Sequence, residues 1–442
     1  MTSTPPRAPT SFEPALPVAD AILYEGYLLY PYRRSADKNR VRWQFGVLLP
    51  RAWADAHGLT DTSVAGSAES WWQQTECLLR VTEGTEVRLR IRFLQLQDKT
   101  LAERTSSAGF RPVSALDLGS RLELSFIEAV PREFDTSLPL TALLDGERQL
   151  TFRIPGGRDT EPLDDERGRL AGQVVRRRWP VTGSLTVGAV PAAAGDAVRL
   201  RIRVENADPG TPATVSRDEA LRRSLIACHC LLAAERGSFI SLLDPPRWAE
   251  AAARACRNVH TFPVLAGEPG GSDLVLSSPI LLYDHPRIAP ESPGDLHDAT
   301  EIDEILSLRT LTLGDAEKRE ARGTDARAAA ILDRVDGMPV QTLAGLHGAI
   351  RPGSGSVTIA GELVRKGSRV RLRPRQHGTD PQDMFLHGRT AQVDAVLHDI
   401  DGSYHLAVTV EDDPGAELNR WYGRFRYFAP EEVEPLRDGE DR

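Results

Sequence analysis

The fold is decided by residues 76–96, ECLLRVTEGTEVRLRIRFLQL, in which apolar and polar side chains alternate closely. The alternation is carried by Val81, Val87, Leu89, Ile91 and Phe93. A period of two is typical of a strand that buries one face, and the Glu-Gly-Thr at 83–85 is a turn signal that interrupts it. The stretch therefore predicts a half-buried sheet.

Segments with the character of strands continue on both sides of this stretch. They lie at 21–30, 40–49, 122–126, 150–154, 179–187 and 198–206. The first two are rich in aromatic and branched side chains and predict a strand pair, and the last two predict another. Regularly spaced short strands are typical of a β-sandwich. We therefore expect a disordered leader over 1–17 and a sandwich-like β region over 18–212, in one or two domains.

The pattern then changes to that of a mixed α/β domain over 213–350. Ser216 and Glu219 form a capping-box pattern, which predicts a helix over about 217–234. An Asp-Pro-Pro start predicts a second helix over 244–256. Strands are expected over 274–283, and further helices over 298–308, 314–321 and 325–335.

Alternation returns in the last region, 356–436. Its strand patterns lie at 369–373, 390–396 and 404–410, and a Lys-Gly turn precedes the first of them. Short strands at this density predict a small SH3-like β-barrel, a fold that usually binds a partner. The whole chain is thus expected to be an α+β multi-domain protein.

Length and composition indicate the number of domains, the kind of partner and the compartment. A length of 442 residues exceeds what one hydrophobic core usually organises. The formal net charge of -9 argues against a general nucleic-acid binder, and four cysteines suit a reducing compartment. Apolar runs stay well short of the roughly 20 residues that span a bilayer, and the N-terminus lacks a signal-peptide pattern. We expect a cytoplasmic protein without a membrane span.

Soft metal ligands gather in one part of the chain, at Cys228, His229 and Cys230, followed by Cys256 and His260. A zinc site needs four ligands that converge, whereas successive residues of a helix point about 100° apart. A buried helical cysteine is commonly just a small apolar residue. We expect no metal or cofactor, and we keep Cys228, Cys230, Cys256 and His260 as an alternative metal-handling group.

A segment rich in acidic residues, histidine and proline covers 284–304. Its carboxylates are of the type that perform acid–base chemistry or hold a hard cation, which keeps an enzyme open as an alternative. The prolines favour instead a rigid segment that presents a binding surface. We favour this second interpretation, and the candidate protein-binding residues are Asp284, His285, Arg287, Glu291 and Asp295.

No familiar catalytic motif accompanies these residues. The sequence has neither G-x-S-x-G nor H-E-x-x-H, and its glycine-rich segments match no phosphate loop or dinucleotide fingerprint. We therefore name no catalytic residue.

Aromatic side chains and arginines are interleaved near the C-terminus, at Arg420, Trp421, Tyr422 and Arg424. Such residues are enriched at protein interfaces, and they also stack on single-stranded nucleic acid. Because the chain is acidic, protein binding is favoured here. Nucleic-acid binding through the last barrel stays an alternative, and it would be sensitive to salt.

Several runs resemble a bacterial protein family of uncharacterised function, whose members tend to be encoded beside high-affinity nickel-iron hydrogenases. The runs are AILYEGYLLYPYR at 21–33, SPILLYDHPRIAPESPGD at 278–295, EIDEIL at 301–306, DMFLHGRTA at 383–391 and ELNRWYGR at 417–424. The resemblance spans nearly the whole chain and brings no catalytic residues. It implies an accessory, assembly or maturation role.

The leading expectation is therefore a non-enzymatic accessory protein that binds a nickel-iron hydrogenase subunit or a maturation intermediate. The chain lacks the C-x-x-C pairs and nucleotide loops of the maturation factors that handle iron ligands or deliver nickel. Since these motifs are missing, we expect a role outside those steps.

Overall fold

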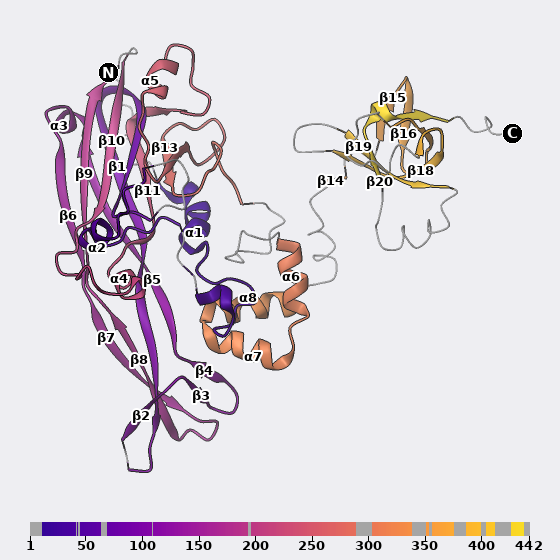
Figure 1. The fold of residues 1–442 in the computed structure, drawn as a ribbon. Coiled ribbons are helices and arrows are strands. Elements are labelled where there is room, and N and C mark those ends of the chain that lie inside the picture. The colour runs from indigo at the N-terminus through magenta and orange to yellow at the C-terminus, as the bar shows by residue number, and fades with distance from the viewer. Residues whose placement is uncertain are drawn as a thin grey trace, which may run out of the picture. The chain divides into compact units, whose positions relative to one another are not determined.

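The computed structural model divides the chain into two compact units, Met1–Pro339 and Val340–Arg442. The residues it describes are 11–40, 42, 45–62, 69–107, 109–192, 196–288, 303–337, 351–352, 356–374, 386–398, 404–411 and 426–436. Antiparallel strands dominate both units, and helices are concentrated in the first (Figure 1). The protein is thus an α+β protein that consists mostly of sheet.

One long strand, β1 (Trp72–Arg104), organises the first unit. This strand belongs to an eleven-stranded sheet with the order β12-β13-β11-β1-β10-β9-β6. In addition, β2, β5 and β8 pair with β1, and β7 pairs with β8. The other strands are β2 (Phe110–Val113), β5 (Phe126–Pro139), β6 (Arg148–Ile154), β7 (Gly157–Asp164), β8 (Leu170–Arg178), β9 (Val181–Pro191), β10 (Ala197–Asn206), β11 (Ile226–Ile240), β12 (Phe262–Leu265) and β13 (Leu274–Ser278). A small hairpin, β3 (Ala115–Asp117) and β4 (Leu122–Leu124), stands apart from this sheet.

The pairing of β1 with β11 is irregular near Gly84. The glycine has a φ of +74°, and the pairing of β1 with β11 shifts register between Val81 and Glu86. Both halves of β1 contribute to one core. Leu79 before this irregularity and Ile91 after it belong to the same buried cluster. The turn signal at 83–85 is therefore a bulge within one continuous strand.

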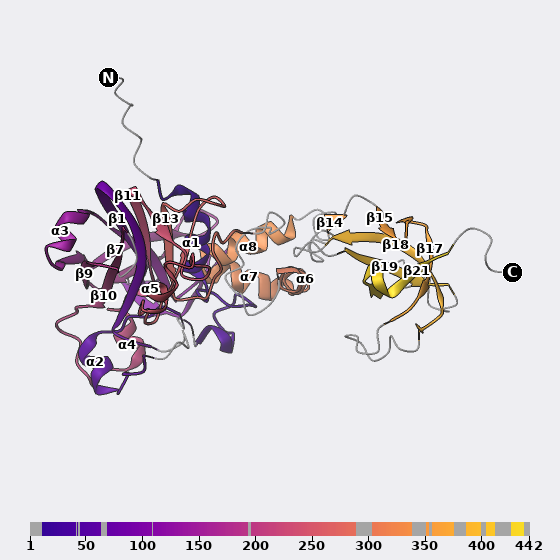
Figure 2. The ribbon, with the colours of Figure 1, turned by 90° about the horizontal axis from the view of Figure 1, so that it is seen from above.

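Helices cover the outer face of the second half of β1. They are α1 (Leu16–Tyr24), α6 (Asp303–Leu311), α7 (Asp315–Thr324) and α8 (Ala326–Asp336). Leu94 and Leu96 pack there against Leu23 of α1 and Ile331 of α8 in a second core. Figures 1 and 2 show α1, α7 and α8 on one side of the sheet. Segments from the two ends of this unit thus share one core.

The first unit also contains shorter helical segments. These are η1 (Glu13–Ala15), η2 (Asp37–Arg40), α2 (Arg51–Ala56), α3 (Leu140–Leu144), α4 (Arg217–Leu221) and α5 (Glu250–Arg254).

The second unit is a small antiparallel β structure with its own core. Its sheet has the order β20-β19-β18-β17-β21, with β14 beside β18, and β15 and β16 form a hairpin. The elements are β14 (Arg351–Pro352), β15 (Ser356–Ile359), β16 (Glu362–Arg365), β17 (Arg369–Leu372), β18 (Thr390–His398), β19 (Tyr404–Val410), β20 (Arg426–Phe428), η4 (Pro430–Glu432) and β21 (Val433–Pro435). Val370, Val393 and Phe428 lie in its core. The β structure predicted over 356–436 agrees with these strands.

The start of the chain differs from the prediction. Residues 1–10 of the predicted leader lie outside the described part, but Phe12 is buried and packs with Ile22 against the outer face of the sheet. Residues 21–24, predicted as strand, are helical, because Ala19, Ile22 and Leu23 recur at helical spacing and face the sheet. In the described part of 40–49, Leu48 forms only isolated bridges.

The predicted helix over 217–234 is wrong beyond its first turn. The capping box forms, since the Glu219 N–H donates to Ser216 Oγ at 3.3 Å, but α4 ends at Leu221. Residues 226–234 are instead a buried part of β11. A run that is buried on both faces and apolar apart from His229 has no helical or strand period, so tertiary pairing decided its structure. The helix predicted over 244–256 likewise shrinks to α5.

This strand also changes the domain organisation. Because β11 and β13 pair within the same sheet as β1, residues on both sides of position 212 belong to one compact unit. The structure therefore differs from the predicted boundary between 18–212 and 213–350. Helices α7 and α8 do agree with the prediction for 314–321 and 325–335.

Replacing Gly183 by alanine should lower the free energy of unfolding by about 2 kcal/mol, because a Cβ there would overlap the Phe152 ring. Phe152 is held between Phe93 and Phe134, with ring centroids 5.9 and 4.9 Å away, so it has little room to move. Gly210, where a Cβ meets nothing within 4 Å, is the matched control. Equal losses for the two variants in urea unfolding would contradict this packing.

Candidate functional site

Asp284 fixes the loop that follows β13. Its Oδ1 accepts a hydrogen bond from the Leu265 N–H at 2.8 Å, and its Oδ2 accepts one from Ser241 Oγ at 2.5 Å. The His285 N–H also donates to the Leu265 carbonyl at 2.7 Å. The predicted binding residue Asp284 is therefore the anchor of the loop, tied to β12 and to the segment after β11.

The loop residues before this anchor alternate between core and solvent. Ile280 and Leu282 pack against the core beneath α1, whereas Leu281 and Tyr283 are 70% and 66% exposed. Ser241 Oγ also accepts from the Leu243 N–H at 3.1 Å, and the Leu243 side chain is 59% exposed. Large apolar side chains are thus exposed to solvent on a backbone that hydrogen bonds fix in place.

The end of the loop is more polar. Arg287 is exposed and forms an ion pair with Glu268 at 3.0 Å, and Ile288 is exposed beside it in the sequence. His285 has a positive φ of 55°, and its Nδ1 has no hydrogen-bond partner within the described residues. We call Leu243, Leu281, Tyr283 and Ile288 the apolar loop surface.

Several sequence candidates lie outside the described residues. These are Glu291 and Asp295 of the acidic segment, and Arg420, Trp421, Tyr422 and Arg424 near the C-terminus. Their role in binding therefore stays a prediction.

The alternative metal-handling group is not brought together. Cys228 and Cys230 lie in β11 and face the core, where Gln73 Nε2 donates to their sulfur atoms at 3.6 and 3.9 Å. Cys256 donates to the Ala252 carbonyl at 3.5 Å, and His260 packs edge-on against Trp72. Among the described residues, no three His, Cys, Asp or Glu side chains converge as metal ligands.

Burial keeps the thiols of this group protonated. Burial raises the pKa of Cys230 to about 12 and the pKa of Cys256 to about 11, and it raises the pKa of Cys228 well above its ordinary value. Because these pKa values lie well above 7, the three groups are neutral at physiological pH. They serve as small core residues.

His229 between these cysteines provides a test by pH. Its Nδ1 donates to the Ala227 carbonyl at 2.8 Å, and burial lowers its pKa from 6.5 to about 4. The unfolded state then binds more protons between about pH 4 and 6.5, so the free energy of unfolding falls as the pH falls through this window. From pH 7 to pH 5 we expect His229 to account for a loss of about 2 kcal/mol.

Urea unfolding at both pH values checks this, with His229→Asn as the comparison. Carboxylates contribute equally to both proteins, so the variant should lose about 2 kcal/mol less than the wild type does between pH 7 and pH 5. An identical loss would show that His229 does not titrate as a buried neutral group.

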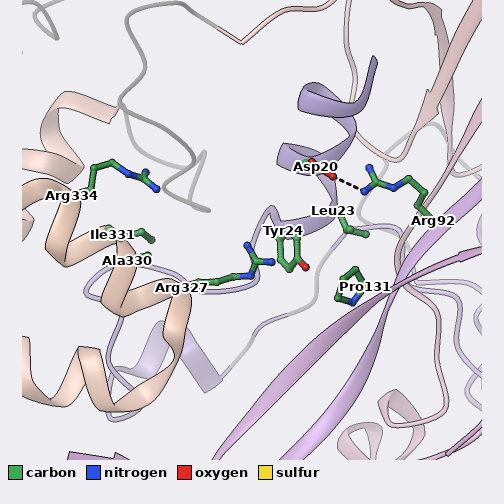
Figure 3. A pocket seen from close by; sticks show the side chains of 9 residues that line it. All are labelled: Asp20, Leu23, Tyr24, Arg92, Pro131, Arg327, Ala330, Ile331 and Arg334. Carbon is green, nitrogen blue, oxygen red and sulfur yellow. Dashed lines mark hydrogen bonds and ion pairs between the residues drawn. The ribbon is translucent and has the colours of Figure 1, made fainter. Parts of the chain in front are cut away.

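A second feature is a cavity of about 350 Å³ between α1, β1, β5 and α8 (Figure 3). Its lining consists of Asp20, Leu23, Tyr24, Arg92, Pro131, Arg327, Ala330, Ile331 and Arg334. We call it the arginine cavity.

Arg92 enters the arginine cavity from β1. Its Nε donates to Glu133 Oε1 at 2.8 Å across the strand pair, and its Nη2 donates to Asp20 of α1. The side chain is only 7% exposed. Its third nitrogen, Nη1, is buried and has no hydrogen-bond partner in the described part of the chain.

Arg327 enters from α8 and lies on an aromatic ring. Its Cζ is 3.4 Å from the ring centroid of Tyr24. Burial raises the pKa of the Tyr24 hydroxyl, an effect that Arg327 partly offsets. No carboxylate of a described residue forms an ion pair with Arg327, in contrast to Arg92.

Sequence reasoning missed the arginine cavity. Arg327, Ala330, Ile331 and Arg334 do repeat at helical spacing, which would have shown that they share one face of α8. No local pattern reveals that this face meets Asp20 and strand β1, because the segments are about 230 to 300 residues apart in the chain.

Comparison of the chain with protein-family models and with curated proteins finds no match. Within the described residues, no helix combines the length and the apolar character that crossing a membrane requires.

Proposed function

We propose that this protein is a non-enzymatic accessory protein that binds a partner protein through the apolar loop surface. The observation that carries the proposal is the exposure of Leu281 and Tyr283 on a backbone that Asp284 anchors. Clustered exposed apolar side chains commonly mark sites of protein interaction.

The energetics of association support this use of the loop. Binding normally costs free energy because loops and side chains become ordered, and a backbone that is already fixed avoids much of that cost. Tyrosine is enriched among the residues that dominate binding energy, and polar rims surround such anchors. Tyr283 and Leu281 would act as anchors, and the Arg287–Glu268 ion pair would belong to the rim.

The partner we propose is a nickel-iron hydrogenase subunit or one of its maturation intermediates. The resemblance described above includes residues 278–295, and that run contains three of the four members of the apolar loop surface. All four cysteines are free thiols, which suits the cytoplasmic location we propose for this role. We further propose that the first unit is sandwich-like and that the second has an SH3-like barrel fold.

Co-purification from the native host tests this function. A tagged full-length chain should recover a hydrogenase subunit in near-stoichiometric amount, identified by mass spectrometry and absent from a tag-only control. Recovery of a different single partner would refute the hydrogenase assignment. Recovery of no partner would refute the accessory role itself.

A further inference from the structure

Two arginines of β7 and β8 face each other without a counter-charge. Arg158 and Arg177 are direct cross-strand partners, so their side chains leave the same face of the sheet with Cβ atoms about 5 Å apart. Both residues are exposed, and neither forms an ion pair with a carboxylate of a described residue. Like charges placed directly opposite each other are destabilising. The two guanidinium groups therefore form a positive surface that the described residues do not neutralise.

The opposite face of the same strand pair is neutralised. Arg176 forms an ion pair with Glu161 at 2.7 Å, and Arg178 forms one with Asp159 at 2.5 Å. Because side chains alternate between the two faces of a strand, these carboxylates of β7 point away from Arg158. Strand β7 thus balances the arginines of one face only.

The carboxylate beside Arg177 is already engaged. Asp98 of β1 is the other cross-strand partner of Arg177, but its Oδ2 accepts from Arg222 Nε and pairs with Arg222 Nη2, both at 3.1 Å. Arg177 and Arg222 also lie over the Trp179 ring, with Cζ 4.8 and 5.1 Å from its centroid. An aromatic ring therefore adjoins the unpaired arginines. We call Arg158, Arg177 and Trp179 the basic patch.

The basic patch lies at a border of the sheet. Among the described strands, β7 pairs only with β8, so the outer edge of β7 presents backbone donors and acceptors (Figure 1). An extended segment laid along this edge would place every second side chain on the face of Arg158. Carboxylates at those positions would match both the charge and the forked donors of the guanidinium groups.

A protein segment fits the basic patch better than nucleic acid does. Affinity for nucleic acid depends on neutralising many phosphates, whereas the chain has a net charge of -9 and the patch offers two unpaired cations. Tryptophan and arginine are enriched among the residues that dominate binding energy between proteins.

From this arrangement we infer that the basic patch binds an extended acidic segment of a partner protein, whose carboxylates pair with Arg158 and Arg177. The patch shares no residue with the apolar loop surface. Binding of an acidic segment and capture of a partner through that surface can therefore fail independently of each other.

Fluorescence anisotropy with the full chain at low ionic strength tests the inference. The probes are two labelled ten-residue peptides, in which threonine alternates with glutamate or with glutamine, and a labelled ten-nucleotide thymidine strand. The glutamate peptide should bind saturably, and the glutamine peptide at least about tenfold more weakly, because it has no charge to pair with the arginines. An absence of saturable binding by the glutamate peptide, equal binding of the glutamine peptide, or tighter binding of the thymidine strand would overturn the inference.

Arg158→Gln combined with Arg177→Gln tests the residue assignment. We expect the affinity for the glutamate peptide to fall at least about tenfold, a size typical of losing charge-assisted hydrogen bonds. The matched control is Arg148→Gln combined with Arg153→Gln, since both of these arginines are exposed on β6 and form no ion pair with a described carboxylate. Both double variants change the net charge equally, so equal affinities would contradict the site.

Sedimentation velocity distinguishes a partner protein from a second copy of this chain. The wild type and both double variants should have the same oligomeric state at the concentrations of the peptide assay. A dimer that only Arg158→Gln combined with Arg177→Gln dissociates would assign the patch to self-association and overturn the inference of a separate partner.

Discussion

Replacing both Leu281 and Tyr283 by aspartate should weaken binding to the captured partner by about 30-fold or more, while the free energy of unfolding stays within about 0.5 kcal/mol of the wild type. Both side chains are largely in water, so the folded protein loses little when they change. In a complex they would be buried, and a charge placed there would have to be desolvated. A loss of about 2 kcal/mol corresponds to the 30-fold effect.

The matched control is Leu363→Asp. Leu363 is 61% exposed in β16 of the second unit, so it resembles Leu281 in type and exposure but lies outside the apolar loop surface. Binding measured by biolayer interferometry against the purified partner should be unchanged for this variant. If Leu363→Asp binds the partner as weakly as the double variant does, exposed apolar groups in general drive the capture. The assignment of binding to the apolar loop surface would then be wrong.

Local signals in the sequence predicted those elements whose structure is determined locally. The Ser216 cap, the helix that starts after Asp325 and the pairing of 179–187 with 198–206 are all present. Each depends on a capping group or on a period that neighbouring residues share. The alternation in 76–96 likewise predicted a strand with one face in a core.

The rest depended on contacts between distant segments. The run 226–234 is apolar except for His229, and its pairing with β1 and β13 makes it a strand. The cavity combines Asp20, Arg92 and Arg327, and nothing near any of them in the sequence indicates the other two. The charged residues of the loop were predicted to form the binding surface. In the structure, both carboxylate oxygens of Asp284 accept hydrogen bonds within the protein, and the exposed side chains are Leu281 and Tyr283.

Replacing Asp325 by alanine should lower the free energy of unfolding of the first unit by about 3 kcal/mol. The side chain caps α8, accepting from the Arg327 N–H at 2.7 Å, and also accepts from the buried Tyr27 hydroxyl at 2.6 Å. A lost cap costs about 1 kcal/mol, and a lost hydrogen bond to a buried charged group costs about 2. Urea unfolding followed by tryptophan fluorescence reports mainly on this unit, since six of the seven tryptophans precede residue 340.

Asp333→Ala, on the same helix, distinguishes this role from a general need for acidic residues. Asp333 is exposed and pairs with Arg322 at the surface, so its loss should cost less than about 1 kcal/mol. Tyr27→Phe combined with Asp325→Ala should cost less than the sum of the two single changes, because both remove the same hydrogen bond. Strictly additive losses would mean that the hydrogen bond between Tyr27 and Asp325 does not stabilise the packing of α8 against the segment after α1.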